Sequence, residues 1–118
     1  MSSNLTRGIV ISVRFDPTEE REIRKTRPAV VVSNPVACRF DAVLQVVPVT
    51  GLPDRDLRPY EALCGSASSG LAQPSRAVAN QIRTVARHRI GQVIGHLTHD
   101  ETAALDQALR IQLALGAD

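Results

Sequence analysis

Short apolar runs alternate along the chain with polar stretches that contain glycine and proline. The runs cover residues 7–13, 29–32, 42–50, 60–64, 76–85 and 92–97, and all of them except 60–64 contain valine or isoleucine. Runs of this length and composition favour strands over helices. The run at 29–32 is continuously apolar, which is typical of a strand covered on both faces. Because no helical pattern separates these runs, they predict a small barrel or sandwich.

A long polar loop follows the first predicted strand. Residues 16–27 contain almost no apolar side chain apart from Ile23. Long loops in small domains are often functional. Pro28 closes the loop, and it favours an extended conformation at Arg27. The pattern therefore places Arg27 at the entrance of the second strand.

Further breaks in the pattern separate the other strands. Ser33-Asn34-Pro35 has turn chemistry, residues 52–59 form a second polar loop, and residues 65–70 form a turn rich in serine and glycine. Pro48 lacks a backbone N–H, which restricts the third strand near that point to an edge, a bulge or a strand end.

A helix is predicted near residues 99–115. Thr98 and Glu101 have the spacing of a capping box, and Asp100 and Glu101 supply acidic charge to the first turn. The helix face that is expected to cover the barrel consists of Ala104, Ala108, Ile111 and Leu115, widened by Leu105, Leu109 and Leu113. Gly116 is the expected end of the helix.

The composition is that of one globular domain over residues 1–118, with a flexible N-terminus at 1–6. Apolar residues make up 43% and charged residues 22% of the 118 positions, which excludes a wholly disordered or fibrous chain. No apolar run approaches the roughly 18 residues that span a bilayer, and the N-terminus lacks a secretory pattern. We therefore expect a cytoplasmic protein without a membrane partner. Cys38 and Cys64 are interpreted as free small hydrophobes.

The charge is weakly basic and is carried mainly by arginine. The formal net charge is +2, and 13 of the 14 basic residues are arginine. Arginine binds phosphate through two parallel hydrogen bonds, so this bias suits a phosphate site, although genome composition explains it equally well.

Most enzyme signatures are absent from the sequence. It has no glycine-rich phosphate loop, no nucleophile elbow and no Cys/His set with zinc spacing, so we expect no metal and no cofactor. His96 and His99 suit a surface pair, and His88 suits a basic turn. Glu22, Arg27 and Thr50 remain as candidates. From the residues alone, an ion pair explains Arg27, and Thr50 can bond its own backbone at a strand end.

Several sequence segments, in order, resemble the MazF/PemK toxin family over almost the whole chain. They are Arg7-Gly8, Phe15-Asp16-Pro17-Thr18, the segment from Lys25 to Asn34, Val47-Pro48-Val49-Thr50, Tyr60-Glu61 and the segment from Asn80 to Val85. The resemblance implies a mainly β fold with a C-terminal helix, an SH3-like small barrel of the CcdB/PemK plasmid-maintenance toxin kind. It also implies a homodimer whose two subunits form a groove for RNA.

The same resemblance implies an activity and a set of site residues. Members of the family cleave single-stranded RNA at short sequences through the substrate's own 2′-hydroxyl, without metal, and a cognate antitoxin inhibits them. Arg27 matches the arginine that stabilises the phosphorane, Thr50 the threonine that holds the scissile phosphate, and Glu22 an acidic loop residue. The expected RNA-binding residues are Arg24, Lys25, Ser33, Asn34, Gln81 and Arg83. A turn role is equally compatible with Ser33 and Asn34, and a dimer contact with Gln81 and Arg83.

Two rival functions belong to other classes. A barrel toxin of the CcdB kind acts on DNA gyrase by protein contact and has no nuclease chemistry. An SH3-like module binds proline-rich ligands in an aromatic groove, and the three aromatic residues Phe15, Phe40 and Tyr60 are too few for one. With so few aromatics, recognition of RNA bases would depend on hydrogen bonds and arginine planes.

Overall fold

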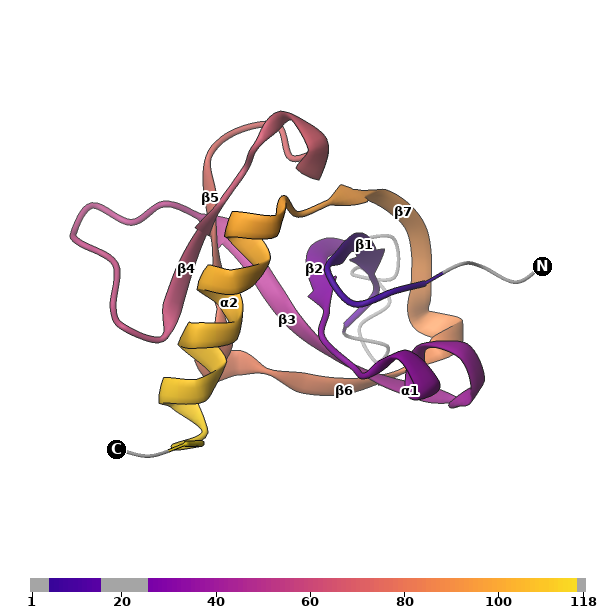
Figure 1. The fold of residues 1–118 in the computed structure, drawn as a ribbon. Helices are drawn as coiled ribbons and strands as arrows, with labels where there is room; N and C mark the ends of the chain where they lie inside the picture. Colours follow the sequence, from indigo (N-terminus) through magenta and orange to yellow (C-terminus); the bar gives the residue numbers. More distant parts are fainter. Residues whose placement is uncertain (1–4, 16–25, 117–118) are drawn as a thin grey trace.

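The computed structural model describes residues 5–15 and 26–116, and in this part of the chain an antiparallel sheet of seven strands precedes a C-terminal helix (Figure 1). The strands are β1 (Ile9–Val13), β2 (Arg27–Val31), β3 (Val43–Gly51), β4 (Glu61–Cys64), β5 (Ser75–Val78), β6 (Arg83–Ala86) and β7 (Ile90–His96). The helices are α1 (Pro35–Phe40) and α2 (His99–Gln112), with 3₁₀ turns η2 (Ala67–Ser69), η3 (Ala79–Gln81) and η4 (Arg87–Arg89). The strand order is β4-β5-β3-β2-β1-β7, and β6 pairs with β3. The predicted mainly β class with a C-terminal helix is confirmed.

The sheet curls until its two ends meet, which gives the barrel form. The turn η2 follows β4, at one end of the strand order, and packs against β7, at the other end. The Ser68 hydroxyl donates to the His96 carbonyl at 3.0 Å. The approach is so close that a Cβ on Gly95 would lie 2.4 Å from the Ser68 carbonyl oxygen. Glycine is therefore required where β7 meets η2.

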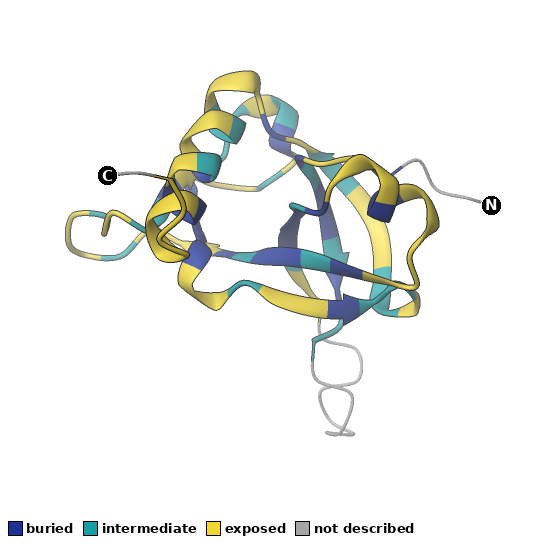
Figure 2. Ribbon diagram, turned by 60° about the horizontal axis from the view of Figure 1, so that its bottom comes forward, coloured by how far each residue is buried: buried dark blue, intermediate teal, exposed yellow. Residues whose placement is uncertain are grey.

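Buried residues, which are coloured dark blue along the ribbon in Figure 2, form two clusters. The first contains Val30, Val47 and Val49 together with Leu105, Ala108 and Leu109 of α2. The second contains Ile11, Val13, Ala29, Val31, Leu44 and Val46. Because neighbouring side chains of a strand point to opposite faces, β2 contributes to both clusters. The prediction of a strand covered on both faces is confirmed for β2.

Pro48 lies where β3 changes its partner. Residues Val43–Val46 of β3 pair with β6, and Val49–Gly51 pair with β5. Pro48 falls between these two ladders, while on its other side it lies opposite Ala29 of β2. A residue without an N–H fits this interruption, in keeping with the restriction that the sequence predicts.

A short helix replaces the turn predicted at Ser33-Asn34-Pro35. Asn34 is the N-cap of α1, its side-chain oxygen accepts from the Ala37 N–H at 2.9 Å, and Pro35 occupies the first turn. At the other end, the Arg87 guanidinium donates to the carbonyls of Ala37, Cys38 and Asp41. Six residues are too few to produce a helical periodicity, so the pattern shows only the cap.

Helix α2 begins as predicted. Thr98 and Glu101 form a complete capping box, and the Glu101 carboxylate also accepts from the backbone N–H and hydroxyl of Ser66 at 3.0 and 2.7 Å. The helix ends at Gln112 rather than near 115, because Ala114 adopts a left-handed φ of 57° and the Leu115 N–H bonds the Arg110 carbonyl. This Schellman ending places the stop before Gly116.

The buried face of α2 differs from the predicted one. The buried residues are Leu105, Ala108 and Leu109, whereas Ala104, Ile111 and Leu115 of the predicted stripe are exposed. Helix α2 packs mainly on β4 and η3, and its buried residues lie between Leu105 and Leu109. The apolar residues of its last turn therefore extend beyond the sheet.

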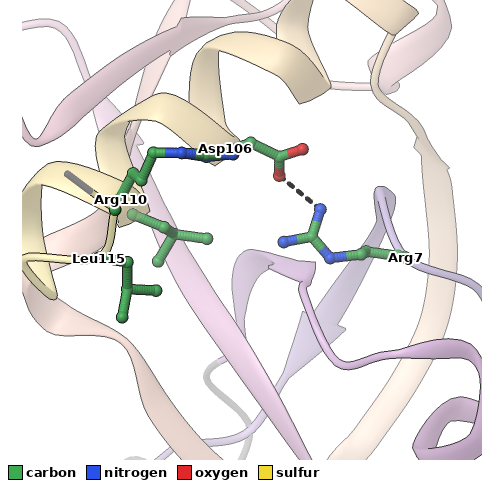
Figure 3. Close-up of a pocket in the computed structure, with 6 residues that line it drawn as sticks. Arg7, Asp106, Arg110 and Leu115 are labelled. Atoms are coloured by element: carbon green, nitrogen blue, oxygen red, sulfur yellow. Dashed lines mark hydrogen bonds and ion pairs between the residues drawn. The ribbon is translucent and has the colours of Figure 1, made fainter.

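An ion pair connects the N-terminal end of the barrel to α2. Arg7 forms an ion pair with Asp106 of α2 (Figure 3). The Arg7 Nε also donates to the Val32 carbonyl at 3.0 Å. Leu5, assigned from the sequence to a flexible N-terminus, is buried in the second cluster.

None of the helices in the described residues is long and apolar enough to cross a membrane.

The observed helix face makes a testable prediction for stability. We expect Leu105→Ala to reduce the free energy of unfolding by about 2–5 kcal/mol, because Leu105 is 2% exposed and its loss leaves a cavity. Leu115→Ala removes the same atoms from a side chain that is 59% exposed, so it should cost less than about 0.5 kcal/mol. Urea unfolding measures both variants. Equal losses would contradict the observed packing.

Candidate active site

Arg27 and Thr50 lie at corresponding positions of adjacent strands. In the β2–β3 ladder, Ala29 pairs with Pro48 and Val30 with Val47. Continuing this antiparallel register two residues beyond the Ala29–Pro48 pair places Arg27 opposite Thr50. Directly opposed residues point to the same face of a sheet. The register therefore directs the guanidinium and the hydroxyl to the same side.

Two surface pockets share these two residues. One, of about 260 Å³, is lined by Arg27, Pro48, Val49, Thr50, Arg76, Val78 and Gln81. The other, of about 280 Å³, is lined by Arg27, Pro28, Val49, Thr50, Gly51, Leu71, Ala72, Gln73 and Ser75. Arg27 and Thr50 are both exposed. The structure thus brings the predicted guanidinium and hydroxyl together in open pockets.

The shared site lies on the side of the sheet that α2 does not cover. Val49, next to Thr50, is buried in the cluster that contains Leu105 and Leu109 of α2. Because adjacent residues of a strand face opposite ways, Thr50 and its cross-strand neighbours point away from that helix. Arg27 and Thr50 therefore lie on the face of the sheet opposite α2.

Of the other predicted site residues, only some lie near Arg27 and Thr50 in the described part of the chain. Gln81, in η3, lines the same pocket as Arg27 and Thr50. The Arg83 guanidinium lies over the Phe15 ring, 4.6 Å from its centre. Glu22, Arg24 and Lys25 lie outside the described residues.

Ser33 and Asn34 make structural hydrogen bonds. Ser33 is 4% exposed, and its hydroxyl accepts from the Gln45 N–H and donates to the Gln45 side-chain oxygen, both at 2.8 Å. The Gln45 amide continues the chain of bonds to Thr84 at 3.0 Å. Asn34 caps α1. RNA binding and a turn role were both compatible with this pair in the sequence, and the observed hydrogen bonds support the structural role.

The sequence prediction missed Arg76, which the structure places in the site. Arg76 of β5 pairs directly with Thr50 of β3 and lines the pocket with Arg27. Its side chain is 18% exposed, and its Nε lies 3.5 Å from the Glu61 carboxylate. The available sequence signal is an arginine that interrupts an apolar strand, just before Ala77, Val78 and Ala79.

Glu61 is a buried carboxylate held by arginine and backbone. Its side chain is 4% exposed and accepts two hydrogen bonds from the Arg55 guanidinium, at 2.9 and 3.0 Å, and one from the Arg58 N–H at 2.8 Å. The hydrogen bonds from Arg55 lower the pKa of Glu61 to about 2, against the opposing effect of burial. This carboxylate is ionised at neutral pH.

The sequence of the chain matches that of a known protein family. The sequence profile of a family described as "PemK-like, MazF-like toxin of type II toxin-antitoxin system" matches residues 6–113. The chain belongs to this family. It is 37% identical to the endoribonuclease MazF9 of Mycobacterium tuberculosis, over 94% of this chain and 98% of that protein. It is 28% identical to the endoribonuclease EndoA of Bacillus subtilis, over 92% and 94% of the two chains.

Solved structures share the fold of this PemK/MazF-like chain. An endoribonuclease from a mycobacterial species, in complex with its cognate antitoxin, superposes with a TM-score of 0.78 at 23% identity, covering 98% of this chain and all of that one. The Mycobacterium tuberculosis toxin MazF-mt6 gives a TM-score of 0.75 at 24% identity, covering 94% of this chain and all of that one.

The remaining titratable candidates of the PemK/MazF-like chain do not join the site. Within the described residues, no three His, Cys, Asp or Glu side chains gather as they would around a metal ion. Cys38 and Cys64 are buried and free, as the sequence predicts. Burial raises the pKa of both thiols, that of Cys64 to about 12, so both are neutral and weakly nucleophilic at neutral pH.

The lowered pKa of Glu61 predicts a pH-dependent contribution to stability. We expect Glu61→Gln to reduce the free energy of unfolding near neutral pH by about 2 kcal/mol, which allows for solvent screening at the partly exposed Arg55. A carboxylate with a lowered pKa stabilises the fold above its unfolded-state pKa of 4.5 and loses this effect as the pH falls towards 2. Urea unfolding of both proteins should therefore give a smaller difference at about pH 3 than at about pH 7. A difference independent of pH would contradict this account.

Proposed function

We propose that this chain is a toxin endoribonuclease that cuts single-stranded RNA at a short sequence by attack of the substrate's own 2′-hydroxyl. The observation that carries the proposal is that Arg27 and Thr50 line the same two open pockets. The names of the two curated relatives, both endoribonucleases, support the reaction class.

The reaction needs stabilisation of negative charge more than it needs a protein nucleophile. The 2′-oxygen attacks the adjacent phosphorus, the bond to the 5′-oxygen breaks, and the products are a 2′,3′-cyclic phosphate and a 5′-hydroxyl. One proton leaves the 2′-hydroxyl and one reaches the departing 5′-oxygen. The pentacoordinate transition state carries extra negative charge on the non-bridging oxygens, where fixed donors are most effective.

Arg27 and Thr50 have different roles in this scheme. The Arg27 guanidinium donates to the phosphorane oxygens, and it acts mainly by electrostatics because arginine is a poor proton shuttle. The Thr50 hydroxyl donates to the scissile phosphate and holds it for in-line attack. Glu22 remains a third proposed catalytic residue, and Arg24, Lys25, Gln81 and Arg83 remain proposed RNA contacts.

The proposed toxin acts as a homodimer in the cytoplasm. Two copies would form one extended RNA groove, and no metal takes part in the reaction. A cognate antitoxin with an acidic, largely disordered tail would occupy the same groove, because a flexible anionic segment can cover an extended basic surface. The solved mycobacterial relative with its cognate antitoxin supports this partner class.

The reaction class is tested by digestion of RNA with excess chelator present. We expect cleavage to continue at an unchanged rate and to leave 2′,3′-cyclic phosphate and 5′-hydroxyl ends. Replacing the 2′-hydroxyl at the mapped cleavage position by hydrogen should leave binding in place and abolish cutting, because the nucleophile is lost. Intact RNA with the natural substrate would instead favour a toxin that acts by protein contact.

Removing the Arg27 guanidinium should abolish most of the activity. We expect Arg27→Ala to lower kcat by at least about 100-fold, the usual loss when one donor to a developing oxyanion is removed. Arg39→Ala is the matched control, because it removes the same charge from an exposed position of α1 outside both pockets. Circular dichroism checks that both variants fold. Full activity of Arg27→Ala would exclude the proposed role.

A further inference from the structure

Arg76 carries buried N–H groups that have no acceptor. Its Nε and Nη1 atoms are buried and make no hydrogen bond among the described residues. The Nε lies near Glu61 at 3.5 Å, without the geometry of a hydrogen bond. Buried donors are nearly always paired in native proteins, so each exception requires an explanation.

The nearest carboxylate does not provide that explanation. Glu61 is already bound by both terminal nitrogens of Arg55 and by the Arg58 N–H. Arg55 neutralises the one negative charge of Glu61, so the group of Arg55, Glu61 and Arg76 keeps a surplus positive charge. This surplus lies on the guanidinium that lacks acceptors.

The position of Arg76 indicates what could neutralise this charge. Arg76 lies directly opposite Thr50, and Thr50 lies opposite Arg27, so the three residues form a row across β5, β3 and β2. Strands are spaced by about 4.8 Å, which places the Cα atoms of Arg27 and Arg76 about 10 Å apart. All three residues line the 260 Å³ pocket.

We propose that Arg76 is a second phosphate-binding residue of the site, which holds the RNA backbone beside the phosphate contacted by Arg27 and Thr50. The inference rests on the proposed function. A phosphate in the pocket that Arg76 lines would neutralise the surplus charge of its guanidinium. Because its Nε is held beside Glu61 in a mostly buried side chain, Arg76 loses little freedom on binding.

A contact of this kind affects binding rather than the chemical step. Arg76 binds a phosphate whose charge does not change during the reaction, so its loss should raise KM and leave kcat within about threefold. Each phosphate contact also contributes about 0.7 to the slope of log affinity against log salt concentration for a single strand. The salt slope is therefore a readout that a purely structural arginine would not change.

The test uses the full-length protein and a mixed-sequence single-stranded DNA, which has the same phosphates and no 2′-hydroxyl. We expect Arg76→Ala to bind this strand about tenfold more weakly at low salt, as for a lost charged hydrogen bond, and to flatten the salt slope by about 0.7. Arg76→Lys should retain the slope, because it keeps the charge. Arg110→Ala removes the same charge from another pocket, lined by Arg7 and Asp106, and should match the wild type. Arg76→Gln replaces Arg76→Ala if the alanine variant does not fold.

RNA cleavage by the same preparations separates the two hypotheses. If the wild type cuts RNA while the variants that remove the Arg76 charge keep its affinity and salt slope, the Arg76 assignment is wrong and the proposed function stands. If the wild type binds the strand but does not cut RNA, the proposed function is wrong, and the salt slopes still decide the role of Arg76. A wild type that neither binds nor cuts would overturn both.

Discussion

The antiparallel register that joins β2, β3 and β5 is the constraint on which the candidate site depends. It places Arg27, Thr50 and Arg76 in one row, although 23 and 26 positions separate successive members in sequence (50 − 27 and 76 − 50). A slip of one residue between β2 and β3 would turn Arg27 and Thr50 to opposite faces. The register is held by burial on both faces, with Val30 and Val47 in one cluster and Ala29 and Val46 in the other. The apolar core of the barrel thus aligns the polar site.

The same packing leaves one face of the site open. Helix α2 covers the first cluster, and Thr50 and its neighbours point to the other side of the sheet. At Pro48, β3 exchanges β6 for β5, which brings Arg76 beside Thr50. Glu61 lies 3.5 Å from the Arg76 Nε, and it binds the loop before β4 through Arg55 and Arg58. Six of the seven residues that line the 260 Å³ pocket therefore belong to strands, whose positions vary little.

Local patterns in the sequence are sufficient to predict the strands and the start of α2, but they do not predict which faces meet. The capping box of Thr98 and Glu101 is a local feature, and the structure contains it. The buried face of α2 depends on the short elements beneath it, so its seven apolar residues could not identify the three that are buried. Helix α1 is too short for periodicity. In the sequence, Arg76 is an isolated charge. Only the pairing of β3 with β5 shows that it lies beside Thr50.

The central claim is that Arg27 and Thr50 act on the same phosphate, and a double-mutant cycle on RNA cleavage tests it most directly. Single-turnover rates of the wild type, Arg27→Ala, Thr50→Val and the double variant measure the coupling between the two side chains. Groups that act as a unit are strongly non-additive, so we expect the double variant to be at most about threefold slower than Arg27→Ala alone. Losses that multiply would show that the two side chains act independently and would contradict the account.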